Sequence, residues 1–164
     1  MSRWQKGEAV VQFLMTRGRL ESFAAVDLAI LANAQIDRAA LRVEATAVAA
    51  LTQGDVDGAY VATYDAYRMA AESLLARQGL RATSGDGSHV TVEDAVSAQF
   101  SADISAFVKP MFERFRRTRH SAQYFDPSAA PITRSDAEWA IEKATAAVAG
   151  ARVLLSASSL ERFA

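Results

Sequence analysis

Residues 54–79, GDVDGAYVATYDAYRMAAESLLARQG, carry the pattern that decides the fold of this chain. Gly54 suits the position that follows one helix, and Asp55 suits the N-cap of the next. An apolar stripe with spacings of three and four residues runs along the segment: Tyr60, Tyr64, Tyr67, Ala71 and Leu74. We therefore expect one long helix that closes at Gly79, with the three tyrosines in the core.

The same periodicity extends to both sides of this segment, and the alternation typical of strands is absent. Residues 20–53 contain neither proline nor glycine, and their apolar stripe consists of Ile36, Ala40, Val43, Ala47 and Ala50. Residues 134–157 carry a similar alanine-rich stripe, and Thr133 with Asp136 predicts a capping box before them. Small stripe residues let helices approach closely, so these segments are expected to pack against one another.

Shorter elements complete the predicted fold. Residues 3–16 predict a first helix, and residues 80–91, rich in glycine and serine, predict a surface loop. Thr91 is expected to cap a short helix. A further helix is expected over 103–125, where Pro110 either kinks the helix or marks its start. The sum is an all-α, antiparallel helical bundle of about five helices in a single domain.

The composition excludes several kinds of site. The chain has no cysteine, which rules out disulfides, thiolate nucleophiles and cysteine-ligated zinc. Its two histidines are too few for a convincing metal site, so neither a metal nor a cofactor is expected. The formal net charge is −1, so attraction to nucleic acid must come from a local patch. No long apolar run or signal-type segment occurs, and a cytoplasmic protein without membrane contact is expected.

The segment RFRRTRHSAQYFD, residues 114–126, concentrates four arginines in an otherwise alanine-rich chain. Helical phasing places the polar groups of this segment on one side: Arg116, Arg117, Arg119, His120, Gln123 and Tyr124. The other side carries Phe115 and further apolar residues that would pack on the bundle. Arginine suits multidentate contact with phosphate, and Arg114 adds another cation to the segment.

His120 is the candidate base of this predicted face. It lies one turn from both Arg116 and Tyr124, and the neighbouring arginines should disfavour its protonated form. A neutral imidazole can accept a proton from a ribose 2′-hydroxyl, while Tyr124 could donate to a phosphate or stack on a base. The segment is equally compatible with a solvated basic face that Glu113 and Asp126 partly neutralise.

Three passages make the chain resemble the HEPN domain family (higher eukaryotes and prokaryotes nucleotide-binding), in particular its small actinobacterial-type members: residues 54–81, 87–94 and 116–124. The resemblance implies a HEPN-like bundle over residues 25–164, with residues 1–24 as an N-terminal helical extension. The third passage is similar to the arginine motif of the family. Arg119 matches the motif arginine, whereas Tyr124 stands where active members carry a histidine, and His120 lies one turn earlier.

The resemblance implies a function and several partners. Active HEPN ribonucleases are homodimers whose two motifs meet in one cleft, so a homodimer with metal-independent endoribonuclease activity is implied. A toxin–antitoxin or defence setting is also implied, with a nucleotidyltransferase-type or other operon partner. Two alternatives remain open, namely a non-catalytic module that binds RNA or another partner, and a purely structural helical dimer.

The candidate site residues follow from the motif and its helical face. The catalytic candidates are Arg119, His120 and Tyr124. The candidates for nucleic-acid binding are Arg114, Arg116, Arg117 and Gln123. The other histidine, His89, is expected to be a surface or capping residue of the polar loop.

Overall fold

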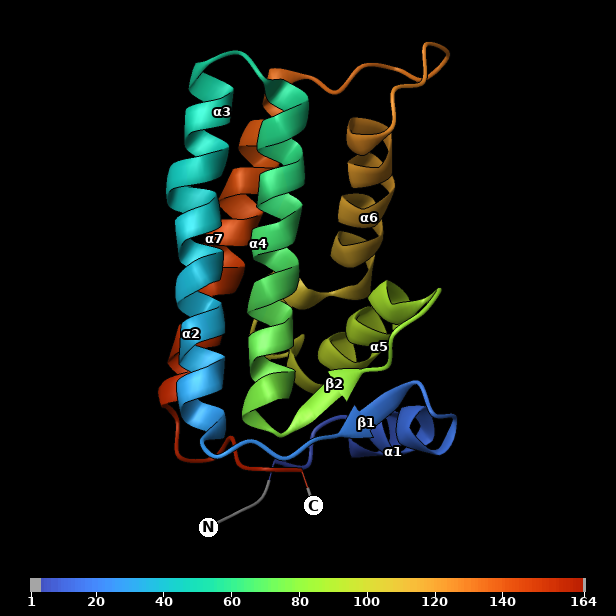
Figure 1. The fold of residues 1–164 in the computed structure, drawn as a ribbon, viewed down its shortest axis with the longest axis vertical. Coiled ribbons are helices and arrows are strands. Elements are labelled where there is room, and N and C mark those ends of the chain that lie inside the picture. Colours follow the sequence, from blue (N-terminus) through green and yellow to red (C-terminus); the bar gives the residue numbers. More distant parts are fainter. Residues whose placement is uncertain (1–3, 164) are drawn as a thin grey trace.

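The computed structural model describes residues 4–163 and confirms an all-α helical bundle. Three long helical columns form its main body (Figure 1): α4 (Val56–Arg77), α7 (Arg134–Ser156), and the run of α2 (Leu28–Leu41), the π-helical turn η1 (Arg42–Ala47) and α3 (Val48–Thr52). Shorter elements cover one side of these columns: α1 (Glu8–Thr16), β1 (Leu20–Ser22), β2 (Leu80–Ala82), α5 (Ser88–Phe100), the 3-10 turn η2 (Ser105–Phe107) and α6 (Lys109–Gln123).

Helix α4 lies in the centre of the bundle and begins and ends as predicted. The Asp55 carboxylate accepts a hydrogen bond from the Gly58 backbone N–H at 2.8 Å, and Gly54 before it takes a left-handed φ of +85°. Tyr60 and Tyr67 are fully buried, and the Tyr67 ring stacks on Phe115 of α6 with 4.2 Å between centroids. The predicted tyrosine stripe is therefore a core stripe.

The α2–α3 column keeps its predicted apolar stripe through a change of helical geometry. Ile36, Ala40, Val43 and Ala47 are buried, as expected, but the last buried position is Leu51 and not Ala50. The π-helical turn between α2 and α3 changes the helical phase. Such a turn cannot be detected from the spacing of apolar residues in the sequence.

Helix α7 packs through small side chains and has the expected capping box. Thr133 accepts from the Asp136 backbone N–H at 3.1 Å, and the Asp136 carboxylate accepts from the Thr133 backbone N–H at 2.9 Å. Its buried face is made almost wholly of alanine: Ala137, Ala140, Ala144, Ala147, Val148 and Ala151.

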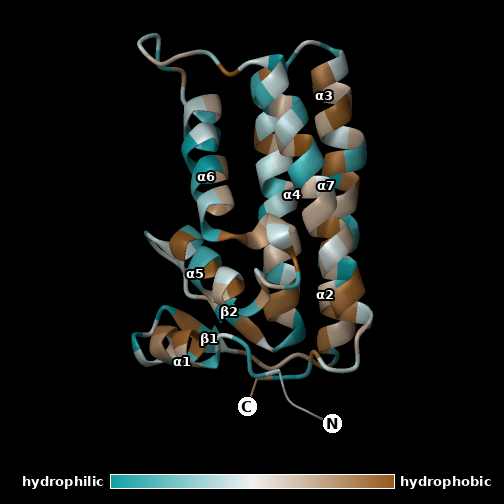
Figure 2. Ribbon diagram, turned by 180° about the vertical axis from the view of Figure 1, so that it is seen from behind, coloured by the Kyte–Doolittle hydropathy of each residue, from teal (hydrophilic) through white to brown (hydrophobic). Residues whose placement is uncertain are grey.

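The expectation for residues 103–125 needs correction. Pro110 lies in the first turn of α6, so it marks the true start of the helix, and the chain before it turns through η2. At the other end Tyr124 takes an extended conformation with φ −114° and ψ 112°, so it lies outside the helix. Figure 2 shows hydrophilic residues along much of α6, consistent with a helix that buries only one narrow side.

Two further expectations were wrong in the lower part of the molecule. The helix after the polar loop begins at Ser88 and not at Thr91, and Gly87 occupies its N-cap. A small antiparallel ladder pairs Leu20 with Ala82 and Ser22 with Leu80, although no strand was expected. Strands of three residues are too short to show alternation in a sequence.

Residues 4–22 pack onto α5 and β2. Among the described helices, none combines the length and the apolar character needed to span a membrane.

Candidate functional site

The arginines of α6 point in different directions, so the predicted single face is divided. The Arg114 guanidinium lies 3.6 Å from the Trp139 ring centroid and 3.9 Å from the Asp136 carboxylate, both on α7. Arg117 is exposed. Arg116 and Arg119 turn toward α5 and α4, where they meet other charged and aromatic groups.

Arg116 forms an ion pair with a buried carboxylate. Its Nε lies 3.5 Å from Oε2 of Glu93 on α5, a side chain that is 2% exposed, whereas the Arg116 side chain is 41% exposed. Burial raises the pKa of Glu93, and the Arg116 charge offsets part of this rise. The Arg116 Nε is buried and has no hydrogen-bond acceptor among the described residues.

Arg119 packs its guanidinium against an aromatic ring of the central helix. Its Cζ lies 5.5 Å from the centroid of Tyr64, within the range of a cation–π contact. The Arg119 Nε, like that of Arg116, is buried without an acceptor in the part of the chain that the structure describes. A buried donor without a partner costs about 1–3 kcal/mol, and an acceptor supplied by a ligand would remove that cost.

His89, expected to be a surface or capping residue, contacts the same tyrosine as Arg119. Its Nδ1 is 2.6 Å from the Tyr64 hydroxyl, and both ring nitrogens are 3.0 Å from Nη1 of Arg68. Arg68 also forms an ion pair with Glu72 one turn later on α4, at 2.7 Å. Three helices therefore bring Tyr64, Arg68, His89, Arg116 and Arg119 together, and we call these five residues the arginine–histidine cluster.

The contacts favour a neutral His89. A protonated imidazole has two donors and no acceptor, and Arg68 also has only donors, so their contact would be repulsive. In the neutral tautomer with the proton on Nδ1, that nitrogen donates to the Tyr64 hydroxyl oxygen and Nε2 accepts from Arg68. Burial lowers the pKa of His89, and the charges of Arg68, Arg119 and Arg116 lower it further.

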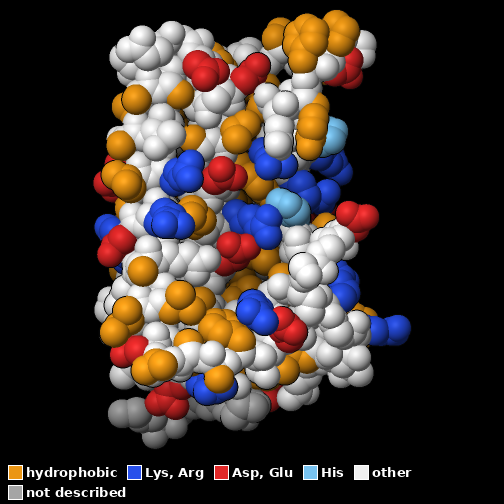
Figure 3. Space-filling model, in the orientation of Figure 1, with side chains coloured by type: hydrophobic (Ala, Val, Ile, Leu, Met, Phe, Trp, Pro, Cys, Tyr) orange, Lys and Arg blue, Asp and Glu red, His pale blue; other side chains and the backbone are white. Residues whose placement is uncertain are grey.

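The cluster lies at the surface as a cationic patch. Figure 3 shows Lys and Arg side chains with histidine at mid-height of the molecule, over α4 and beside α6. Glu72 and Glu93 neutralise only part of this charge, since each pairs with one arginine. The arrangement offers three guanidinium groups and a neutral imidazole to an anion.

His120 and Tyr124 lie further along α6, at its exposed end. Their ring centroids are 4.9 Å apart, and Tyr124 is 55% exposed. No hydrogen bond or ring contact joins either residue to the arginine–histidine cluster within residues 4–163. The structure thus brings together Arg116 and Arg119 of the predicted site and leaves His120, Tyr124 and Gln123 apart from them.

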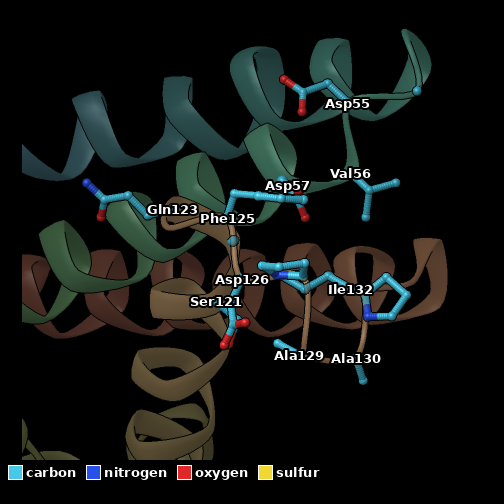
Figure 4. Close-up of a pocket in the computed structure, with 14 residues that line it drawn as sticks. Asp55, Val56, Asp57, Ser121, Gln123, Phe125, Asp126, Ala129, Ala130 and Ile132 are labelled. Carbon is cyan, nitrogen blue, oxygen red and sulfur yellow. The ribbon is translucent and has the colours of Figure 1, made fainter.

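A separate cavity of about 610 Å³ lies between the α3–α4 turn and the segment after α6 (Figure 4). Asp55 and Asp57 line it from the turn, and Gln123, Phe125 and Asp126 line it from the other segment. The three aspartates would repel a phosphate, so this cavity does not extend the cationic site.

Helical phasing could not find Arg68 and His89, because they belong to other helices than the arginine segment. One signal was available for Arg68, which follows Tyr64 by one turn and interrupts an apolar, alanine-rich helix. His89 lies in the first turn of α5, a helix whose start was placed too late. The described residues contain no group of three or more His, Asp or Glu side chains that could hold a metal ion.

No family model matches the chain, and no curated protein and no solved structure matches it significantly. The HEPN assignment therefore stays a prediction that rests on the three sequence passages.

Proposed function

We propose that the protein binds RNA through the arginine–histidine cluster, with a backbone phosphate held by Arg68, Arg116 and Arg119. The observation that supports this proposal is the gathering of three arginines from two helices around Tyr64 and His89, where Arg68 contacts His89, Arg119 contacts Tyr64, and the charge of Arg116 acts on His89. Arginine presents a planar fork of donors that matches phosphate oxygens. Because the whole chain has a net charge of −1, this local patch has to supply the attraction.

The binding proposal is tested with a ribodinucleotide monophosphate, whose single phosphate fits one cluster. Arg119→Gln and Arg68→Gln should each weaken binding about tenfold or more, because a hydrogen bond to a charged group contributes about 1.5–3 kcal/mol. The affinity is measured by isothermal titration calorimetry.

Arg114→Gln is the matched control, since Arg114 lies on the same helix but contacts α7. It removes one charge and should leave the affinity within about twofold, as expected for a distant exposed charge. Equal losses in all three variants would contradict the proposed cluster. Thermal unfolding of each variant separates lost binding from lost folding.

A second candidate function is metal-independent endoribonuclease activity, and the neutral state of His89 favours it. In this reaction His89 Nε2 accepts the proton of a ribose 2′-hydroxyl once Arg68 turns to the phosphate. The 2′ oxygen then bonds to phosphorus, the bond to the 5′ oxygen breaks, and water protonates the leaving oxygen. The products are a 2′,3′-cyclic phosphate and a free 5′-hydroxyl, and the arginines stabilise the charge on phosphorus.

Cleavage of single-stranded RNA in EDTA tests this second function. If His89 is the base, His89→Gln should reduce the rate about 10²–10⁴-fold, and His120→Gln should keep it. The reverse result would place the base in the arginine segment, as the sequence predicted. No cleavage by the unaltered chain would leave RNA binding as its function.

The resemblance also leads us to propose a cytoplasmic homodimer with an operon partner, for instance a nucleotidyltransferase. Three exposed apolar side chains of the α2–α3 column support an interface with another chain: Ile30, Leu41 and Val48. Light scattering at several concentrations tests the dimer, and a monomer throughout would reject it.

A further inference from the structure

A second group of arginines lies across α4 from the cluster, on the α2–α3 column. Arg38 and Arg42 are exposed, and within residues 4–163 neither is held in an ion pair with an acidic residue. Asp37 beside them pairs instead with Arg152 of α7, at 2.9 Å. Two free cations thus remain on this part of the surface.

One contact fixes the direction in which these arginines point. The Gln35 side chain donates to Glu72 of α4 at 3.4 Å, so Gln35 lies on the side of α2 that faces the exposed edge of α4. Arg38 and Arg42 follow Gln35 by three and seven residues, which places them on the same side of the helix. They therefore flank α4 on the surface that carries Arg68.

Helices α2 and α4 run antiparallel, and this direction determines which part of α4 each arginine of the α2–α3 column lies beside (Figure 1). Moving along α2 from Gln35 to Arg38 corresponds to moving back along α4 from Glu72 toward Arg68. Figure 3 agrees, because blue side chains form a band at mid-height from the α2 side to the α6 side. Red side chains also lie among the blue ones, and Glu72 of α4 is paired with Arg68.

We propose that this band is a track for single-stranded RNA, running from Arg38 and Arg42 across Arg68 to Arg116 and Arg119. This inference rests on the proposed binding of RNA phosphate in the cluster. The track crosses two helix-to-helix spacings of about 8–10 Å each, so it is about 20 Å long. About six nucleotides span that length at the stacked rise of 3.4 Å.

The track fits a single strand better than a duplex. Its cations run across the helices as one narrow band and do not form two parallel rows. A single flexible strand can follow such a line phosphate by phosphate. A duplex would present two rows of phosphates and would leave one of them without a partner.

The test compares two ligands on the intact chain, a ribodinucleotide monophosphate and an unstructured RNA oligonucleotide that is longer than the track. The variant Arg38→Gln/Arg42→Gln removes the distal end of the track. Arg17→Gln/Arg134→Gln removes the same charge elsewhere, since Arg134 pairs with Glu138 on α7, and serves as the control. The affinities are measured over a range of salt concentrations by fluorescence anisotropy for the oligonucleotide and by calorimetry for the dinucleotide.

We expect the Arg38/Arg42 variant to bind the oligonucleotide about tenfold more weakly, as for two exposed charge pairs. The slope of log affinity against log salt concentration should become shallower by about 1.4, which is the value for losing contacts with two phosphates of a single strand. Binding of the dinucleotide should not change, and the control should bind both ligands like the unaltered chain.

Each other outcome points to a different failure. If the dinucleotide binds but the oligonucleotide affinity is unchanged in the Arg38/Arg42 variant, the track is wrong and the cluster stands. If the dinucleotide does not bind the unaltered chain, the proposed function fails and the track fails with it. If a duplex of the same length binds as tightly as the single strand, the single-strand assignment is overturned.

Discussion

His89 is the residue whose ionisation should report ligand binding. Its pKa is lowered in the free protein by burial and by Arg68, Arg119 and Arg116. A bound anion neutralises those arginines and favours the imidazolium, so pyrophosphate should raise the pKa of His89. A titration followed by NMR of the imidazole protons checks this shift. The imidazole protons of His120, at the exposed end of α6, are the internal reference. Equal shifts of both histidines would indicate diffuse charge effects only.

The same histidine should make folding stability depend on pH. Because the pKa of His89 is lower in the folded chain than in the unfolded one, the unfolded chain takes up a proton first as the pH falls. The contribution of His89 is fully present above about pH 6.5 and declines as the pH falls toward the folded value.

His89→Gln should flatten this decline in the free energy of unfolding, measured with urea between about pH 5 and 7. An unchanged pH dependence would mean that other groups cause it.

At the level of residues, the sequence predicts two of the five members of the arginine–histidine cluster as site residues. Arg116 and Arg119 could be singled out because four arginines in one segment are conspicuous by composition alone. Arg68 and His89 could not, since their importance arises from contacts between α4 and α5 that no phasing of a single helix contains. Sequence alone favours His120 because it is adjacent to the arginines in the chain, whereas His89 is held in the cluster by contacts with Tyr64 and Arg68.

At the level of elements, one glycine controls how α1 is attached to α5. Gly7 caps α1 with φ +69°, and a Cβ at this position would come within 2.7 Å of the Ala98 backbone. Gly54 has a similar φ of +85° but open space around it. Gly54→Ala should therefore lower the free energy of unfolding by about 1–2 kcal/mol, the cost of the left-handed conformation. Gly7→Ala should lower it by more, because the contact with the Ala98 backbone adds to this cost.

Urea unfolding gives both values. Hydrogen exchange should show faster opening of α1 in Gly7→Ala alone. Similar losses in the two variants would mean that α1 adjusts its position without cost.

The elements that sequence reasoning predicted well share a physical cause. Long apolar stripes and capping residues such as Asp55 and Thr133 predict helices α4 and α7. Both signals are local, because each depends on residues that lie a few positions apart in the chain. The ladder of β1 with β2 joins segments about sixty residues apart, so its determinant is tertiary. The same holds for the π-helical turn η1, which lies against α4.

At the level of the whole molecule, residues 4–22 should support the site although they contain none of its residues. Arg19 donates to Thr91 at 3.2 Å, and Thr83 donates to the Gly18 carbonyl at 3.0 Å, so this segment holds the chain on both sides of His89.

Deleting residues 1–24 should leave a helical bundle, seen by circular dichroism, but should weaken dinucleotide binding severalfold. Arg19→Gln should weaken it in the same direction and to a smaller extent. Unchanged affinity in the truncated chain would show that α4 and α6 alone position the cluster.

The pairing of β1 with β2 also has a consequence for the order of events during synthesis. The N-terminal strand leaves the ribosome long before its partner, and it has to wait while α2, α3 and α4 emerge and begin to pack. His89 follows β2 in the chain, and Arg116 and Arg119 emerge later still. A nascent chain therefore carries no complete cationic site until α6 is outside the exit tunnel, so the RNA binding proposed above would be confined to chains that have passed this point.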